Sequence, residues 1–443
     1  MVTTVGKFFV QNFGCRATQA DGAALESSLA AGGLSQAGER SAADLVVLNT
    51  CTVTVSADED VRQTIRRVHR ENPAARILVT GCYAQRAPQE LARMPGVEWV
   101  VGNSHKHAIP ELIALAPANA PYHGNIHVGD IHVGDIFAQH AFLSAPVEDA
   151  AGDRTRPNLK IQDGCNNRCS FCIIPFVRGG SRGMPADEVV AQVGRLALRY
   201  REVVLTGINL GRWGREPGST LRLAGLLRRL LGETTIERLR LSSVEPMDFS
   251  DELLELMASS ARIAPHVHAP LQSGSDRILR RMHRKYRPRH YADRILKARR
   301  LMPDAAIGAD VMVGFPGETD TDFEESRQFI DGLPFTYLHV FTYSERPGTP
   351  AAEDPLAVPT AVRKERNRVL RDLADRKNRE FRQRMVGRTL SAVTLHEPGT
   401  ALTGNYLKVQ LASLRSPNLM ADVQIGGLTS DGLREVGHAL ACP

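Results

Sequence analysis

The segment Lys160-Ile-Gln-Asp-Gly-Cys-Asn-Asn-Arg-Cys-Ser-Phe-Cys-Ile-Ile-Pro175 contains three cysteines, Cys165, Cys169 and Cys172, within a single short stretch. An iron–sulfur cluster with four irons usually takes four cysteines, one for each iron. A cluster held by three thiolates therefore has one iron open to a small molecule, as a cluster that reacts with a bound cofactor requires. The alternative is a structural zinc site, but zinc motifs usually contain two Cys or His pairs, and no second pair lies nearby.

Composition limits the class of protein. The chain has 443 residues, 42% of them hydrophobic, which predicts about three domains with packed cores. It contains no apolar run near the roughly 18 residues that span a membrane, and Met1–Val10 lacks the apolar core of a signal peptide. Seven cysteines, an odd number, indicate reduced thiols and metal ligation rather than disulfides. We therefore expect a cytoplasmic protein with no membrane partner.

Positive charge is concentrated in one segment. The net charge of the chain is +6, and Arg363–Arg384 alone carries ten basic and four acidic side chains, which accounts for all of it. Clustered Lys and Arg side chains indicate a nucleic-acid partner. The alternative is a solvated helix with internal ion pairs, in which Leu370 and Leu373 form the packing stripe.

Three apolar, strand-like runs near the N-terminus each end in a cysteine: Lys7–Cys15, Asp44–Cys51 and Ala75–Cys82. Helical stretches follow at residues 18–31, 56–71 and 87–93, and a fourth strand is predicted at Val97–Val101. Strands that alternate with helices predict a doubly wound parallel sheet, in which functional groups gather beyond the carboxyl ends of the strands. The three cysteines should therefore converge as a second metal site. The alternative is three buried cysteines that act as small hydrophobic side chains. Cys442 lies outside this pattern, and we expect no role for it.

A tandem duplication, Ile126–Asp130 followed by Ile131–Asp135, connects this block to the next. His127 and His132 are conceivable metal ligands, but a local duplication in a loop or hairpin is the favoured interpretation. The Pro-, Gly- and Asp-rich stretch Pro146–Pro157 is predicted to be a linker.

Six further strand candidates occur between residues 156 and 360, separated by amphipathic segments: Leu159–Gln162, Glu202–Thr206, Arg238–Leu241, His266–Ala269, Ile307–Val313 and Tyr337–Tyr343. Six strand–helix units predict an incomplete parallel barrel, because a complete eight-fold barrel takes about 250 residues. Groups suited to ribose hydroxyls or an amino-acid moiety, and glycines that let backbone approach a ligand, follow the strands. These groups are Asp163–Cys165, Thr206–Asn209, Ser242–Glu245, Gln272–Ser275, Gly314–Glu318 and Ser344–Thr349.

Several longer motifs carry a family resemblance: Gly14–Arg16, Asn49–Thr54, Gly81–Gln85, the cysteine run through Gly179, Thr206–Gly211, Pro270–Ser275, Asp310–Glu318 and Phe341–Pro350. On these residues the chain resembles the methylthiotransferases, radical S-adenosylmethionine (SAM) enzymes with two iron–sulfur clusters, over nearly its whole length. One departure is Arg16-Ala-Thr-Gln19, which replaces the commoner Lys-x-Asn-Gln, so that the surroundings of one cluster are expected to differ.

The resemblance implies a role for each cysteine set. Cys165, Cys169 and Cys172 would hold the [4Fe-4S] cluster that cleaves SAM, and Cys15, Cys51 and Cys82 would hold an auxiliary [4Fe-4S] cluster. SAM contacts are expected from an aromatic residue in the cysteine loop and from the strand ends: Phe171, Thr206, Gly207, Asn209, Ser243, Glu245, Gln272, Asp310 and Gly314.

Residues 386–443 are predicted to be rich in strands, at Thr389–Leu395, Tyr406–Leu411, Leu419–Ile425 and Arg434–Val436. They are similar in position and size to the small RNA-binding β-barrel, called TRAM, that ends these enzymes. We therefore expect three domains, at residues 1–145, 151–385 and 386–443. The last has few Lys and Arg residues, so the neighbouring basic segment is expected to contribute phosphate contacts.

The resemblance also implies a reaction. Arg178-Gly-Gly-Ser-Arg182 and Leu402–Val409 are most similar to the branch that adds a methylthio group to C2 of N6-threonylcarbamoyladenosine beside the tRNA anticodon. The expected partners are the tRNA anticodon stem-loop and a reducing electron donor. Alternatives are isopentenyl-adenosine in tRNA, a ribosomal protein, or a non-catalytic iron–sulfur protein that binds RNA. Arg178, with Arg182 in reserve, is the candidate partner of the threonylcarbamoyl carboxylate; tRNA phosphates and the SAM carboxylate are alternative ligands.

Overall fold

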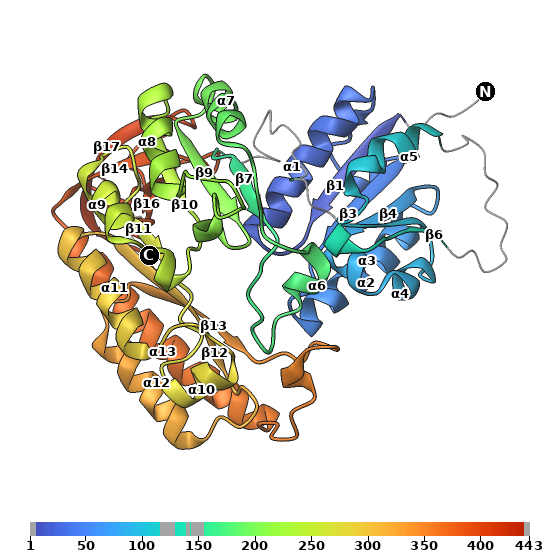
Figure 1. Ribbon diagram of the computed structural model, residues 1–443. Helices are drawn as coiled ribbons and strands as arrows, with labels where there is room; N and C mark the ends of the chain where they lie inside the picture. The colour runs from blue at the N-terminus through green and yellow to red at the C-terminus, as the bar shows by residue number, and fades with distance from the viewer. Residues whose placement is uncertain (1–5, 116–128, 139–141, 143–154, 438–443) are drawn as a thin grey trace, which may run out of the picture. The chain divides into compact units, whose positions relative to one another are not determined.

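The computed structural model describes residues 6–115, 129–138, 142 and 155–437. Two compact units make up the chain (Figure 1). The first unit comprises Met1–Ala151, Gln162–Met184 and Ser344–Thr349; the second comprises Gly152–Ile161, Pro185–Tyr343 and Pro350–Pro443. Among the described residues, none of the helices combines the length and apolar character needed to cross a membrane.

The first unit is built on a parallel sheet with the strand order β2-β1-β3-β4-β5-β6. Its strands are β1 (Lys7–Asn12), β2 (Ser35–Gln36), β3 (Leu45–Thr50), β4 (Arg76–Gly81), β5 (Val97–Gly102) and β6 (Asp130–His132). Its longer helices are α1 (Arg16–Ala31), α2 (Val55–Glu71), α3 (Cys82–Arg86), α4 (Pro88–Ala92), α5 (Ile109–Leu115) and α6 (Ile174–Arg178).

The central strand β3 is buried along its whole length, and its side chains alternate between two cores. Val46 and Leu48 pack with residues of α2, α3 and α4, whereas Leu45 and Val47 pack with residues of α1 and α5. Alternate residues of a strand point to opposite faces, so helices cover both faces of this sheet. The predicted doubly wound fold is confirmed.

The second copy of the tandem duplication contributes a strand rather than a loop. β6 pairs in parallel with β5, with Val100 opposite Ile131 and Val101 opposite His132. Hairpin strands are antiparallel, so the favoured interpretation as a loop or hairpin is wrong for this copy. His127 and most of Pro146–Pro157 lie outside the described residues.

The second unit contains the barrel-like part of the chain. Its parallel strands are β7 (Asn158–Asp163, whose last two residues belong to the first unit), β9 (Glu202–Gly207), β10 (Arg238–Leu241), β11 (His266–His268), β12 (Ala306–Val313) and β13 (Tyr337–Thr342). The amide of Ala264 donates to Leu239 O (2.8 Å), which joins the β10 side to the β11 side. The six predicted strands and the incomplete barrel are confirmed.

Helices alternate with these strands in the second unit: α7 (Ala186–Ala197), α8 (Leu223–Glu233), α9 (Asp251–Ser259), α10 (Asp276–Arg281), α11 (Pro288–Leu301), α12 (Asp320–Gly332) and α13 (Thr360–Met385). Short β8 (Arg182–Gly183) pairs with the end of β7 in the first unit. Turns of 3-10 helix occur at Arg40–Ala42, Lys106–Ala108, Ile136–Ala138, Leu210–Arg212, Pro246–Asp248 and Pro350–Ala352.

A closed five-stranded barrel ends the described chain, with the order β14-β15-β16-β18-β17. Its strands are β14 (Thr389–Thr394), β15 (Thr400–Thr403), β16 (Lys408–Gln410), β17 (Met420–Leu428) and β18 (Leu433–Glu435), of which only β15 was not predicted. The expected boundary at residue 386 falls at the end of α13. This barrel nevertheless belongs to the same compact unit as β9–β13, because its core includes Ala306 of β12 and Phe381 of α13.

Candidate functional site

The three strand-end cysteines of the first unit lie where the sheet places them. Cys15 caps the start of α1, Cys51 follows β3, and Cys82 is the first residue of α3, directly after β4. Gly14 has a φ of +92°, and a Cβ there would lie 2.5 Å from the Cys51 Cβ and 2.8 Å from its Sγ. Only glycine permits this approach, so the chain before Cys15 passes directly over Cys51.

Ionising the thiols of this set is unfavourable unless a cation is bound. Burial, together with the nearby Cys82 and Cys15, raises the pKa of Cys51 to about 12. Thiolates crowded in a buried site need a compensating positive charge, which a soft metal centre supplies. Asn103 Nδ2 also approaches Cys82 Sγ (3.6 Å) and donates to Val177 O (2.8 Å). The donor set therefore fits an iron–sulfur cluster held by three cysteines.

The second cysteine set is shaped by the loop that follows β7. Gly164 has a φ of +70°, and a Cβ there would lie 1.9 Å from Gly180 O, so only glycine fits. The amide of Cys165 donates to Gly179 O (3.0 Å), and the amide of Asn167 donates to Cys165 Sγ (3.4 Å). All three cysteines of the loop are partly exposed. This local arrangement fits a cluster that is open to a small molecule.

Both cysteine sets lie in the first unit, and their supporting helices pack together. Cys82 at the start of α3 packs with Ile173 and Val177. Ile173 directly follows Cys172 and precedes α6, and Val177 lies in α6. The segment Ser344–Thr349 also returns to this unit. Arg346 Nη1 donates to Asp58 Oδ2 (2.7 Å) and to Thr52 O (3.2 Å), beside Cys51.

Arg178 is buried and ion-paired within the first unit. Its side chain is only 2% exposed, and it donates to Asp21 Oδ2 (3.0 Å) and to Asp163 Oδ1 (2.9 Å), both in the first unit. Burial opposes its charge, but Cys82, Asp163 and Asp21 raise the pKa of Arg178 well above the ordinary value. The role of Arg178 toward the threonylcarbamoyl carboxylate stays a prediction. The reserve residue Arg182 is also buried and donates to Arg178 O (3.0 Å).

The strand-end residues expected to bind SAM fall in both units. Phe171 belongs to the first unit, and Thr206, Gly207, Asn209, Ser243, Glu245, Gln272, Asp310 and Gly314 belong to the second. Gln272 has a φ of +65°, held by hydrogen bonds from its amide to Asp310 O and from the Met312 amide to its own carbonyl (2.8 Å each). Glu245 is ion-paired with Arg284. Their roles toward SAM stay a prediction.

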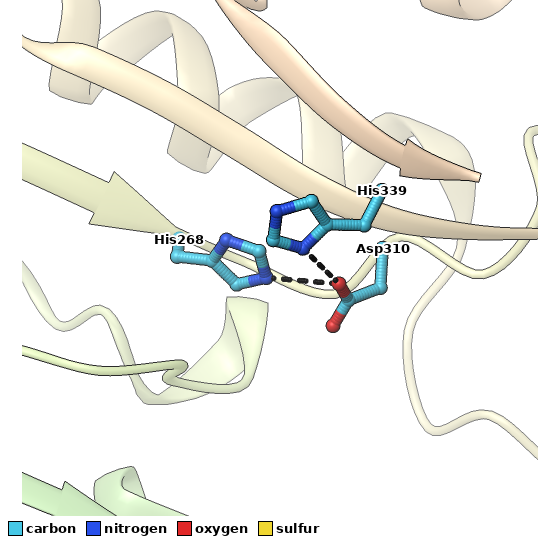
Figure 2. Close-up of side chains that lie close together, drawn as sticks. All are labelled: His268, Asp310 and His339. Carbon is cyan, nitrogen blue, oxygen red and sulfur yellow. Dashed lines mark hydrogen bonds and ion pairs between the residues drawn. The ribbon is translucent and has the colours of Figure 1, made fainter. Parts of the chain in front are cut away.

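A cluster that we did not predict lies on one face of β11, β12 and β13. His268 Nε2 lies 3.2 Å from Asp310 Oδ1, and His339 Nδ1 lies 3.1 Å from the same oxygen (Figure 2). We had considered Asp310 only as a cofactor residue. The sequence did contain a signal for this cluster. His266 and His268 are two residues apart, as are Tyr337 and His339, so the members of each pair lie on the same face of their strand.

Most basic side chains of α13 are engaged within the chain. Arg366, Arg368 and Arg376 form ion pairs with carboxylates. Lys377 donates to Asp331 O and Leu333 O. Arg382 donates to three carbonyls of the turn that follows β17. Leu370 and Leu373 are buried, as the solvated-helix interpretation predicts. Lys364, Arg371 and Arg379 are exposed.

Two family models match the chain: Radical SAM superfamily over residues 159–330, and Uncharacterized protein family UPF0004 over residues 7–102. The chain is 38% identical to the threonylcarbamoyladenosine tRNA methylthiotransferase MtaB of Aquifex aeolicus, over 91% of this chain and 96% of that protein. It is 40% identical to the same-named protein of Bacillus subtilis, over 79% and 76%. It is 33% identical to the tRNA-2-methylthio-N(6)-dimethylallyladenosine synthase of Novosphingobium aromaticivorans, over 97% and 95%.

A solved structure shares the fold. The radical SAM methyltransferase TsrM of Kitasatospora setae superimposes with a TM-score of 0.56 at 17% identity, over 78% of this chain and 75% of that one. The chain belongs to the radical SAM methylthiotransferase family. It is accordingly an enzyme that uses SAM and a [4Fe-4S] cluster.

Proposed function

We propose that this enzyme adds a methylthio group to C2 of N6-threonylcarbamoyladenosine next to the anticodon of tRNA, using two [4Fe-4S] clusters. The observation that carries the proposal is the presence of two separate three-cysteine sets in one compact unit. The match to the radical SAM superfamily by itself implies only the cluster that acts with SAM. A second set with its own glycine-lined approach supports a second cluster.

Each cysteine set has a proposed role. Cys165, Cys169 and Cys172 hold the cluster that binds SAM, and Cys15, Cys51 and Cys82 hold the auxiliary cluster. When bound, SAM and the clusters supply the radical, sulfur and methyl chemistry of the reaction. The chain orients these groups: Asn103 and α6 brace Cys82, the Gly164 turn fixes Cys165, and Arg178 offsets the negative charge of the thiolates.

The choice of tRNA substrate rests on the relatives. The two enzymes named for threonylcarbamoyladenosine are 38% and 40% identical to this chain, and the dimethylallyladenosine enzyme is 33% identical. Bases in RNA loops are unstacked easily, which suits an enzyme that must reach adenine C2. We propose that the exposed Lys364, Arg371 and Arg379 contact the phosphates of the anticodon stem-loop. A reducing electron donor completes the set of partners.

Iron analysis tests the two-cluster arrangement. Loaded without oxygen, the enzyme should contain about eight irons, four for each set. Replacing Cys165, Cys169 and Cys172 with Ala should leave about four irons and abolish formation of 5′-deoxyadenosine from SAM. Replacing Cys15, Cys51 and Cys82 should also leave about four irons but preserve that reaction while stopping methylthiolation. Loss of all iron from either variant would mean that six thiols serve one centre.

A second assay tests the substrate. Anticodon stem-loops that carry either threonylcarbamoyl- or isopentenyl-adenosine are incubated with the loaded enzyme, SAM and reductant, and the nucleosides are analysed by mass spectrometry. The threonylcarbamoyl form should gain the methylthio group. Modification of the isopentenyl form alone would refute the substrate assignment and leave the reaction class intact.

A further inference from the structure

His268, Asp310 and His339 bring three potential metal ligands together from three neighbouring strands. The ligand atoms His268 Nε2, Asp310 Oδ1 and His339 Nδ1 all lie within 4.8 Å of one another (Figure 2). Bonds of about 2.1 Å from a metal ion to nitrogen or oxygen place neighbouring ligand atoms roughly 3 to 3.5 Å apart. The two contacts to Asp310, 3.2 and 3.1 Å, already have this spacing.

A hydrogen-bond chain fixes the ring of His268. Tyr337 Oη lies 2.8 Å from His268 Nδ1 and 2.7 Å from His266 Nε2. Two proton arrangements satisfy this chain. In one, His268 donates from Nε2 to Asp310 and accepts from Tyr337 at Nδ1. In the other, Nδ1 donates to Tyr337 and the Nε2 lone pair faces the Asp310 carboxylate, so that a second proton or a metal ion must lie between them. A ligating histidine usually donates its other ring N–H in this way.

The cluster is accessible from one side. The His339 side chain is 53% exposed, whereas the side chain of His268 is 7% exposed. His339 also lines a cavity of about 300 Å³ with residues of α13 and of the C-terminal barrel, among them Asn378, Asn405 and Tyr406. An ion can therefore reach the cluster from the His339 side.

We propose that His268, Asp310 and His339 bind a divalent transition-metal ion, separate from the cysteine-held clusters. Two imidazoles and one carboxylate are a ligand set suited to Mn²⁺, Fe²⁺ or Zn²⁺. Three protein ligands leave coordination positions open on the accessible side for oxygen donors of a small ligand.

On the proposed function, the bound ion would be a cation available to the substrate carboxylate. The threonylcarbamoyl group carries a carboxylate, and Arg178 is committed to Asp21 and Asp163. A divalent ion on one carboxylate keeps a net positive charge and can accept a second carboxylate. The isopentenyl group has no oxygen to offer to such an ion.

A Mn²⁺ titration of the cluster-loaded enzyme tests the metal site. The cysteines are then occupied, and Mn²⁺ prefers nitrogen and oxygen ligands. Free Mn²⁺ is counted by its electron paramagnetic resonance signal. We expect one bound ion per chain, displaced by Zn²⁺. His339→Ala and Asp310→Asn should each weaken binding by at least about tenfold, because losing a ligand costs no less than losing a second-layer partner.

His396→Ala is the matched control, since His396 is an exposed histidine of the C-terminal barrel outside the cluster. His339→Gln keeps the size of the side chain if the alanine variant proves unstable. The proposal is overturned if the unaltered enzyme binds no ion, or if the His339 and His396 variants bind equally well. Neither result depends on which tRNA is modified, so failure of the metal site is distinguishable from failure of the proposed function.

Discussion

The two cysteine sets are brought together by different structural routes. Cys165, Cys169 and Cys172 share one loop whose shape depends on neighbouring residues, from Gly164 to Gly180. Cys15, Cys51 and Cys82 come from three strand ends and meet only after the sheet has formed. A local set tolerates changes elsewhere in the chain, whereas a set assembled by tertiary structure depends on every strand that carries it.

The largest expected effect is the loss of the cluster held by Cys165, Cys169 and Cys172. In Gly164→Ala the new Cβ would overlap Gly180 O, so the loop must shift and its cluster is lost. Iron content should fall from about eight to about four, and 5′-deoxyadenosine formation should fall at least about a hundredfold. Gly387→Ala is the control, because Gly387 also has a positive φ but nothing lies within 4 Å of its Cβ position. Unchanged cleavage in the Gly164 variant would contradict the assignment of this loop.

The assembled set should fail without harming the local one. Gly14→Ala would drive a Cβ into Cys51, whereas Gly33→Ala has an equally positive φ and open space. In both variants a non-glycine residue with a positive φ lowers the stability of the fold by roughly 1 to 2 kcal/mol. The two variants therefore differ only in the clash with Cys51. The Gly14 variant should retain about four irons and SAM cleavage but lose methylthiolation. If SAM cleavage disappears as well, the two sets are not independent.

Arg178→Gln tests a support that both sets share. The change leaves Asp163 and Asp21 buried with less positive charge beside them, although Lys106 still donates to Asp21 (3.1 Å). Breaking a buried ion pair costs about 3 to 5 kcal/mol, which urea unfolding would measure. Iron should be lost from both sets in parallel. Arg40→Gln, which breaks a more exposed pair with Glu71, should cost about 0 to 1 kcal/mol.

The smallest effect should spare both sets. Changing Lys364, Arg371 and Arg379 to Gln should make tRNA binding less dependent on salt. The slope of the logarithm of the binding constant against the logarithm of the salt concentration should become shallower by roughly 0.7 to 0.9 for each lost contact. Iron content should not change. Arg228→Gln, at an exposed position of α8, is the control. An unaltered slope would mean that α13 is a solvated helix without contacts to RNA.

The periodicity of hydrophobic residues and the spacing of the motifs were sufficient to predict most of the fold. The strand-end position of Cys15, Cys51 and Cys82 was visible in sequence because each apolar run stops at the cysteine. The ion pair of Arg178 was not, since its partner Asp21 lies 157 residues away and looks like an ordinary polar residue of a helix. The His268 cluster was missed for the same reason: its members come from three strands, and their pairing depends on register.

A buried arginine connects the C-terminal barrel to the rest of its unit. Arg240 donates to Gly404 O (2.9 Å) and Thr403 O (3.1 Å) and pairs with the fully buried Glu202. A chain shortened at residue 386 would therefore uncover a guanidinium, a carboxylate and the apolar surface around Ala306. The C-terminal barrel therefore depends on the rest of its unit, and exchanging it between relatives requires exchanging the residues around Arg240 and Ala306 as well.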